Sequence, residues 1–169
     1  LTRLMKVADR FSKIGSETLL SPANVNEVVG NSVMYFRTRI PRNVTLSYNG
    51  LAIAPVQAMI NGALFEWVVE NLLKNSLDAL QGQGEIDVRI SDDLEWVYID
   101  VKDTGKGIPK SNFKRIFEPG FTTKTRGWGL GLSLSRRIVE EYHKGRIYVV
   151  DSEPGRGTTI RIALRRLYV

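Results

Sequence analysis

The longest helical pattern in the sequence covers residues 61–84, and it constrains the fold more than any other segment. Its apolar residues recur three and four positions apart, which places them on one face of a helix. The pattern begins near Asn61 and stops at the glycine pair Gly82 and Gly84, and both features are typical of helix ends. A helix with such a stripe must bury it against another layer, so this segment predicts a layered domain.

Patterns on either side of this helix indicate a mixed sheet. Residues 21–40 have helical spacing, and residues 41–50 alternate like a strand that ends at a turn signal. Later patterns are two strands at residues 85–91 and 95–103, a helix at residues 130–145 and a hairpin at residues 146–167. We predict an α/β (α+β) two-layer sandwich: a mixed, mainly antiparallel sheet of about five strands with about three helices on one face, plus an N-terminal helix.

Composition and charge exclude several classes of protein. The 169 residues are 43% hydrophobic and 25% charged, as in ordinary globular domains. The chain has no cysteine, which excludes disulfides and thiolate metal sites, and one histidine cannot build a multi-histidine site. The net charge of +6 is spread over short clusters, so we expect no nucleic-acid partner. The weakly polar run at residues 51–65 is too interrupted to span a bilayer.

Three polar side chains follow one face of the long helix. Asn71, Asn75 and Asp78 lie four and three positions apart. Asparagine is a mediocre helix former, so two of them inside one helix need a reason. An amide oxygen is a hard ligand that suits Mg²⁺, an ion that keeps several waters and takes few protein ligands. Taken alone, however, a solvated polar face explains this pattern slightly better than a metal site.

Asp103 stands at the end of a strand pattern, directly before Gly105 and Gly107. A carboxylate in that place can accept a hydrogen bond from the exocyclic amine of a flat ligand while bare glycine backbone lies against its ring. An ordinary Asp-rich turn has the same pattern, so the segment by itself does not decide between the two.

Glycine occupies the alternate positions Gly127, Gly129 and Gly131 just before the last helical pattern. A helix N-terminus presents unpaired N–H groups, and glycines let a phosphate approach them closely. Lys124 adds positive charge nearby. The segment is not a P-loop, and the dinucleotide fingerprint would need glycine where Leu132 stands. A tight turn with nothing bound remains an equal alternative.

Four motifs occur in a set order: Asn-x3-Asn on a helix, Asp-x-Gly-x-Gly after a strand, Gly-x-Gly-x-Gly-Leu before a helix and Gly-x-Gly-Thr before the last strand. As a set, over roughly residues 43–166, they resemble the ATP-binding domain of sensor histidine kinases, in the superfamily shared with gyrase B subunits and mismatch-repair MutL. The resemblance implies a Bergerat-type ATP-binding fold. The segments "NSLDA" and "EPGFTTK" resemble those of the nitrogen-regulator-like branch of these kinases.

The resemblance assigns the phosphate end of a nucleotide site. "ENLLKNSLDA" is similar to the N box, so Asn75 would ligate the Mg²⁺ that bridges the ATP phosphates, and Asn71 would orient the metal or a water. The gyrase branch has a general-base glutamate where Asn71 stands, which argues against fast ATP hydrolysis. Glu70, one residue earlier, is the other candidate catalytic residue. Many family members carry Lys or Arg where Asp78 stands, so Lys124 is the better candidate for meeting the phosphates.

The other boxes complete the implied site. "DTGKG" resembles the G1 box, in which Asp103 would accept from the adenine amino group, and Gly105 and Gly107 would shape the pocket. "GRGTTI" resembles the last box, which would put Thr158 near the adenine, and "IFEPGFTTK" resembles the F box, which braces a lid. "GWGLGL" resembles the G2 box, whose cofactor-binding residues would be Gly127, Gly129, Leu130, Gly131 and Leu132.

Such a site implies transfer of the γ-phosphate of ATP to a histidine, with ATP and Mg²⁺ as cofactors. In the family the acceptor histidine lies on a helical hairpin before the ATP domain. His143 instead matches the helix after the G2 box, and we interpret it as a half-buried helix-end side chain that interacts with the helix dipole. Residues 1–20 resemble the tail of the hairpin's second helix, and residues 21–169 would be the ATP-binding domain.

The resemblance also implies partners: the phosphoacceptor hairpin domain of a parent kinase, the receiver domain of a response regulator, and a second copy that associates through the N-terminal helix. We expect a cytoplasmic location for this domain. The parent protein could be anchored in the inner membrane by a segment outside the domain. Two alternatives stay open. One is a gyrase- or chaperone-type ATPase, and the other is a degenerate module that binds partners without nucleotide.

Overall fold

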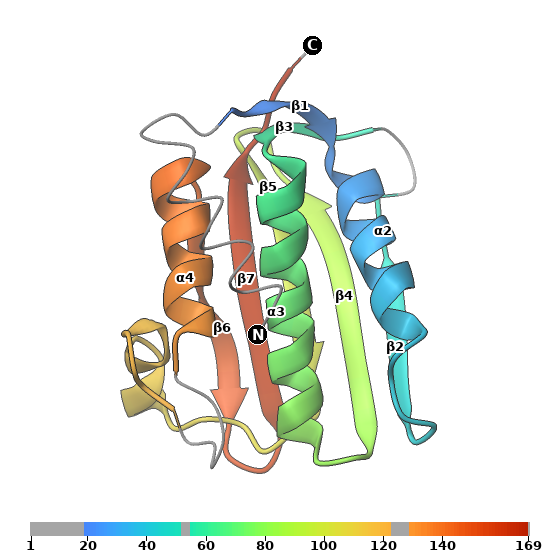
Figure 1. Cartoon of the computed structure of the whole chain (residues 1–169), viewed down its shortest axis with the longest axis vertical. Coiled ribbons are helices and arrows are strands. Elements are labelled where there is room, and N and C mark those ends of the chain that lie inside the picture. The colour runs from blue at the N-terminus through green and yellow to red at the C-terminus, as the bar shows by residue number, and fades with distance from the viewer. Residues whose placement is uncertain (1–18, 52–54, 123–128, 169) are drawn as a thin grey trace.

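The computed structural model describes residues 19–51, 55–122 and 129–168, and Figure 1 shows helices packed over a sheet. The helices are α2 (Val25–Arg37), α3 (Gly62–Leu80) and α4 (Gly131–Arg137), which continues as the π-helical turn η3 (Ile138–Tyr142); η1 (Lys110–Asn112) and η2 (Arg115–Phe117) are short 3₁₀ turns. The strands are β1 (Ser21–Asn24), β2 (Val44–Asn49), β3 (Gln57–Ile60), β4 (Gly84–Asp92), β5 (Trp96–Asp103), β6 (Arg146–Glu153) and β7 (Gly157–Arg165).

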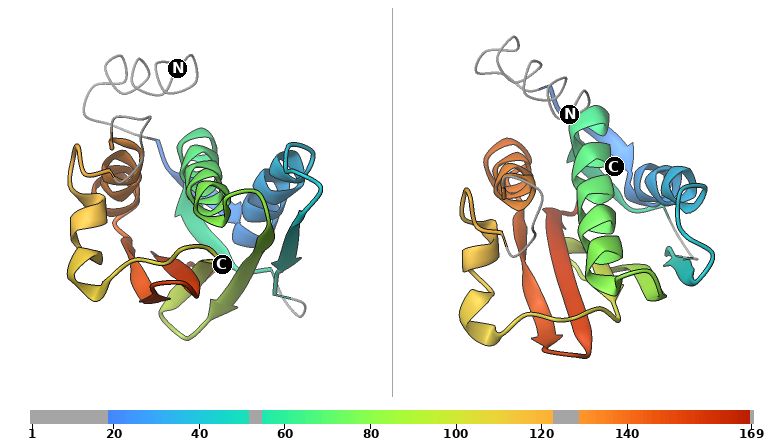
Figure 2. Two further views of the ribbon diagram at one scale, coloured as in Figure 1. Left: turned by 90° about the horizontal axis from the view of Figure 1, so that it is seen from below. Right: turned by 60° about the horizontal axis from the view of Figure 1, so that its bottom comes forward.

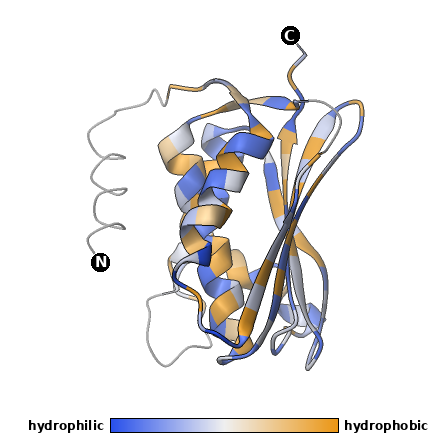
Figure 3. Ribbon diagram, turned by 90° about the vertical axis from the view of Figure 1, so that its right-hand side faces the viewer, coloured by the Kyte–Doolittle hydropathy of each residue, from blue (hydrophilic) through white to orange (hydrophobic). Residues whose placement is uncertain are grey.

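The main sheet has five strands in the order β2-β4-β5-β7-β6. β2 runs parallel to β4, and the other neighbouring pairs are antiparallel. Figures 2 and 3 show α2, α3 and α4 on one face of this sheet, and none of the described helices covers the opposite face. The predicted two-layer sandwich is therefore confirmed. The expected N-terminal helix falls on residues 1–18, which lie outside the described part of the chain.

Helix α3 lies between α2 and α4 in the helical layer (Figure 2). As predicted, Asn61 begins it, and its side chain accepts a hydrogen bond from the Leu64 N–H at 3.1 Å. Gln81 ends it in the left-handed conformation at φ 54°, just before Gly82. The buried residues of α3 are Leu64, Phe65, Val68, Val69, Glu70, Leu72, Leu73, Ser76 and Leu80. Because this stripe spans the whole helix, α3 is fixed against the sheet along its length.

The strands alternate between a buried and a more exposed face. The inward residues of β4 and β5 are Ile86, Val88, Ile90, Val97, Ile99 and Val101, and all are buried. They meet the stripe of α3 and form one continuous core with the inner faces of α2 and β7. None of the described helices is both long and apolar enough to cross a membrane.

The pair of short strands β1 and β3 was not predicted from the sequence. They form a separate two-stranded antiparallel sheet, in which Pro22 pairs with Met59. β3 lies inside the weakly polar run at residues 51–65, and β1 ends at Asn24, whose side chain caps α2. Each strand is four residues long and owes its conformation to a partner more than 30 positions away, so local periodicity gives no sign of either.

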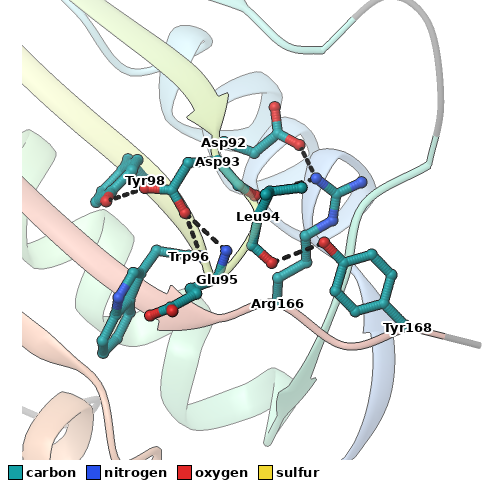
Figure 4. A network of polar contacts seen from close by, with 8 residues as sticks. All are labelled: Asp92, Asp93, Leu94, Glu95, Trp96, Tyr98, Arg166 and Tyr168. Carbon is teal, nitrogen blue, oxygen red and sulfur yellow. Dashed lines mark hydrogen bonds and ion pairs between the residues drawn. The ribbon is translucent and has the colours of Figure 1, made fainter.

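The C-terminal segment after β7 is tied to the turn between β4 and β5 (Figure 4). Arg166 forms an ion pair with Asp92 and also donates to the backbone oxygen of Asp93 at 3.1 Å. The Tyr168 hydroxyl donates to the backbone oxygen of Leu94 at 2.7 Å. The Asp93 carboxylate also accepts two backbone N–H groups of the turn, at 2.8 and 2.7 Å. These contacts fix the end of the sheet opposite to the one at which Asp103 lies.

His143 differs from the sequence-based interpretation. It is buried, at 5% exposure, rather than half-buried. Its Nδ1–H donates to the Ile138 backbone oxygen at 2.9 Å, and its Nε2 accepts the Asn61 N–H at 3.1 Å. That pair of contacts needs the neutral ring, and burial lowers the pKa of His143. The predicted half-buried position is therefore wrong, and a neutral ring makes no charge interaction with the helix dipole. The ring instead joins the end of η3 to the start of α3.

The buried neutral ring predicts acid destabilisation. Because the folded-state pKa of His143 lies below the ordinary value of 6.5, the unfolded chain takes up a proton that the folded chain does not. The free energy of unfolding should therefore fall as the pH drops below that value and level off above it. In urea titrations we expect the free energy of unfolding to fall progressively between about pH 7 and 5.5, as the unfolded chain takes up this proton. His143→Gln should be less stable at neutral pH and show a flatter dependence. If His143→Gln had the same pH dependence of the free energy of unfolding as the parent, the assignment of a buried neutral ring would be contradicted.

Candidate functional site

The residues singled out in the sequence converge at one end of the domain. Figure 1 shows that the end of α3 and the turn between β6 and β7 lie at its lower end, and that α4 begins on the side of the helical layer facing this end. β5 delivers Asp103 there, and Thr158 is its register partner on β7. Lys124 and Gly127 fall outside the described residues. The other predicted site residues can be placed.

Asp103 is a buried carboxylate, at 5% exposure. Its Oδ1 accepts the Gly105 N–H at 2.9 Å and the Thr158 N–H at 3.3 Å. The Ser76 side chain also hydrogen-bonds to it. Burial raises the pKa of Asp103, and these three hydrogen bonds oppose that shift. Donors from α3, from the loop after β5 and from β7 thus fix the orientation of this carboxylate.

Gly105 and Gly107 let the loop after β5 pass between two other segments. The N–H of Lys106 donates to the Ala79 oxygen at 3.1 Å, and its own oxygen accepts the Gly155 N–H at 2.7 Å. A Cβ on Gly105 would lie 2.6 Å from the Ala79 oxygen. A Cβ on Gly107, whose φ is +70°, would lie 1.9 Å from the Glu153 oxygen. Protein backbone alone therefore requires both glycines, before any ligand is considered.

Thr158 belongs to a hydroxyl cluster beside Asp103. The Ser152 hydroxyl donates to the Gly157 oxygen at 2.9 Å and lies 2.8 Å from the Thr158 hydroxyl. Ser152 also accepts the Ile108 N–H at 2.8 Å, which ties the loop after β5 to β6. Sequence reasoning missed Ser152 and Ser76. Ser76 lies among the buried apolar residues of α3, and nothing in the residues around Ser152 marks it.

The asparagines of α3 face the start of α4. Asn71 is half-buried, and its Nδ2 donates to the Ser135 hydroxyl at 2.9 Å. Asn75 is also half-buried and lies one turn further along α3, whereas Asp78 is exposed. Glu70 is buried on a neighbouring face of the helix. The predicted polar face of α3 therefore lies partly in the protein, not in solvent.

The glycine-rich segment is described from Gly129 onward. Gly129 has φ +66°, and its oxygen accepts the Gly120 N–H at 3.0 Å. Leu130 precedes α4 and offers no capping side chain, so the N–H groups of the first turn receive no acceptor from it. The space beside Gly131 is filled by the Asn71 amide. Leu132 is half-buried against the core.

The segment before the glycines is held by aromatic packing. Phe117 is buried at the end of η2, and Phe121 packs against the core. The Arg115 guanidinium lies 5.0 Å from the centre of the Phe121 ring. Both aromatic residues therefore anchor the first part of the segment "IFEPGFTTK", which resembles the F box.

The chemistry of the α3 asparagines suits a Mg²⁺ ion, because an amide oxygen is a hard ligand of the kind that this ion takes. No group of three or more His, Asp or Glu side chains suited to a metal occurs among the described residues. An ion beside Asn75 would therefore take most of its ligands from water and from phosphate oxygens. That is the usual arrangement for Mg²⁺ in nucleotide sites.

Comparison with known sequences gives consistent matches. Residues 61–167 match a family model described as histidine kinase-, DNA gyrase B-, and HSP90-like ATPase. Sporulation kinase A of Bacillus subtilis is 43% identical over 93 residues, which cover 55% of this chain and 15% of that protein. Nitrogen regulation protein NtrY of Azorhizobium caulinodans is 30% identical over 172 aligned residues, which cover 95% of this chain and 21% of that protein. The chain thus spans about a fifth or less of the length of these two relatives.

Comparison with solved structures gives the same fold. The catalytic domain of histidine kinase ThkA superposes with a TM-score of 0.78 at 27% identity, over 88% of this chain and 96% of that chain. A structure of ThkA in complex with the response regulator protein TrrA superposes with a TM-score of 0.77 at 24% identity, over 98% of this chain and 48% of that chain.

The loop after β5 predicts a sharp difference between two glycines. Gly107→Ala meets the Glu153 backbone, whereas Gly155→Ala, at a similar φ of +83°, meets nothing within 4 Å. Gly155→Ala should cost about 1–2 kcal/mol for its backbone conformation alone. Gly107→Ala should cost about 1–3 kcal/mol more in urea unfolding, because of the added clash. If the two variants lost equal free energy of unfolding, the close contact between Gly107 and the Glu153 backbone would be contradicted.

Proposed function

The chain belongs to the family of histidine kinase-, DNA gyrase B- and HSP90-like ATPases, and from this premise we propose that it binds Mg-ATP and donates the γ-phosphate to a histidine on a helical-hairpin domain, in two-component signal transduction. The observation that carries the proposal is the buried Asp103 carboxylate. It ends β5 and accepts a hydrogen bond from Ser76, the residue that follows Asn75 on α3.

Asp103 is suited to recognise adenine. An ionised carboxylate has about four acceptor positions, and the protein supplies Asp103 with three donors. A position is left for the exocyclic amino group of the base. The hydroxyl of Thr158, whose N–H donates to Asp103, lies 2.8 Å from that of Ser152, and we assign both to the adenine end of the site. Because the carboxylate is held from three segments, it loses little freedom when it binds the base.

The phosphate end of the site is assigned to α3 and α4. Asn75 would contribute an amide oxygen to the magnesium ion, which supplies positive charge beside the phosphate oxygens when it is bound. The first-turn N–H groups of α4 would face the phosphates, next to Gly129, Leu130 and Gly131. Lys124, assigned from the sequence, would add a cation.

Asn71 and Glu70 would set the kind of chemistry. Phosphoryl transfer depends mainly on positioning and on charge stabilisation. Asn71 is an amide that already donates to Ser135, and an amide cannot take a proton from water as a carboxylate can. Glu70, although a carboxylate, is buried on another face of α3. This arrangement favours transfer to a positioned acceptor over hydrolysis.

The family resemblance supports proposals for the partners and the location. Residues 1–20 would end the hairpin's second helix and residues 21–169 would form the catalytic domain, with association of two copies through the N-terminal helix. The histidine kinase ThkA has been solved with a response regulator protein, and we propose a receiver domain of that class as the final phosphate acceptor. We place the reaction in the cytoplasm, whether or not a parent protein is anchored in the inner membrane.

Calorimetry with Mg-ATP tests the site. Asp103→Ala should weaken binding by about tenfold or more and reduce the preference for ATP over GTP, because it removes a hydrogen bond to a charged group. Asn75→Ala should abolish the gain in affinity that Mg²⁺ provides. Asp87→Ala, on the outer face of β4, is the matched control and should bind as the parent does. Unchanged binding by both site variants would show that the site is misplaced.

Phosphate transfer in trans tests the reaction. The chain would be mixed with Mg-ATP labelled at the γ-phosphate and a separately supplied hairpin domain that carries the acceptor histidine. We expect acid-labile label on the hairpin, and none with Asn75→Ala. A chain that binds ATP but leaves every such hairpin unlabelled would count against the kinase. Steady ATP turnover that Glu70→Gln abolishes would instead support the hydrolase alternative.

A further inference from the structure

Helix α4 contacts the middle of α3 through two side chains, Asn71 and Ser135, to which the sequence analysis gave no joint role. Asn71 Nδ2 donates to the Ser135 hydroxyl oxygen at 2.9 Å. The Ser135 hydroxyl in turn donates to the Gly131 backbone oxygen at 2.8 Å. Ser135 is fully buried, at 0% exposure, so no water competes for either contact. A short chain of hydrogen bonds therefore connects α3 with the start of α4.

The single proton of the serine hydroxyl fixes the orientation of the asparagine amide. The Gly131 backbone oxygen can only accept, so the Ser135 proton must point toward it. The serine oxygen can then only accept from α3. Asn71 must therefore present its NH₂ group to Ser135 and turn its oxygen the other way.

The backbone of Gly131 lies against the face of the same amide. A Cβ built on Gly131 would lie 2.7 Å from Asn71 Oδ1 and 3.1 Å from Nδ2, so the amide lies flat against bare backbone. The Asn71 oxygen is thereby placed at the first residue of α4. Asn75, the proposed magnesium ligand, lies one turn along the same helix.

Ser133 shows that the contact with α3 is specific to Ser135. Both serines lie in α4, and both hydroxyls donate back to a backbone oxygen, Ser133 to Leu130 at 3.0 Å. Such a bond satisfies a serine inside a helix. Ser135 alone uses its remaining acceptor position for a side chain of α3.

We propose that Ser135 is a positioning residue for the nucleotide site: it holds the Asn71 amide so that the amide oxygen stays at the start of α4, beside the place of the magnesium ion and the phosphates. The inference rests on the proposed function, because it gives Ser135 a role in Mg-ATP binding. Loss of the hydroxyl frees the amide to rotate and leaves its N–H without a partner, which should weaken the metal-dependent part of binding.

The test compares Ser135→Ala with Ser133→Ala, using Mg-ATP and metal-free ADP as ligands in calorimetry. Ser135→Ala should raise the Kd for Mg-ATP by about three- to tenfold, the effect of one hydrogen bond. It should change the Kd for metal-free ADP by less than about twofold. Ser133→Ala should leave both constants unchanged. In an Asn71→Ala background Ser135→Ala should add nothing, because the amide that it positions is gone.

A spectroscopic measurement checks the contact without nucleotide. The side-chain amide protons of Asn71, followed by NMR, should shift and exchange faster with solvent in Ser135→Ala but not in Ser133→Ala. The positioning role would be overturned if Ser135→Ala weakened the binding of Mg-ATP and of metal-free ADP equally, or left Mg-ATP binding unchanged. It would also be overturned if Ser135→Ala still weakened Mg-ATP binding in the Asn71→Ala background. A parent chain that binds no Mg-ATP would overturn the proposed function as well, whereas a silent Ser135→Ala in a parent that binds would overturn this inference alone.

Discussion

The need to solvate one buried carboxylate shapes the end of the domain where the site lies. Burial removes Asp103 from water and raises its pKa, and a charge in that position is tolerated only if protein donors replace the lost water. The donors come from three segments that are far apart in the chain: Ser76 on α3, Gly105 after β5 and Thr158 on β7. Those segments must come close together, and the close approach of the Gly105 backbone to Ala79 of α3 is part of this packing.

Helix α3 contributes to the site through two of its faces. Its apolar stripe fixes it on the sheet, and its polar face borders α4. Asn71 and Asn75 therefore gain rigid backbone positions from the packing of their neighbours in the core. An amide in the middle of a helix is unfavourable by propensity, and here a contact in the tertiary structure offsets that cost for Asn71.

Much of the fold could be read from the sequence because most elements are amphipathic at a single period. The stripe of α3, its cap at Asn61 and the alternation in β4 and β5 all follow from local spacing. The strands β1 and β3 could not be found in this way, since each is defined by its partner. His143 was misjudged for the same reason. Its charge depends on burial and on the Asn61 N–H, which is 82 positions away.

The sequence by itself determined the order of the long elements, the family resemblance and the residue types that the site uses. Asp103, Asn71 and Asn75 were identified because their chemistry is unusual for their place in a strand or a helix. The tertiary structure alone decided how those groups are held. Ser76, Ser135 and other small hydroxyl residues are common in every context, and only the distances between segments make them hydrogen-bond partners. The local spacing of apolar and polar residues encodes secondary structure, whereas a hydrogen-bond network depends on contacts across the whole fold.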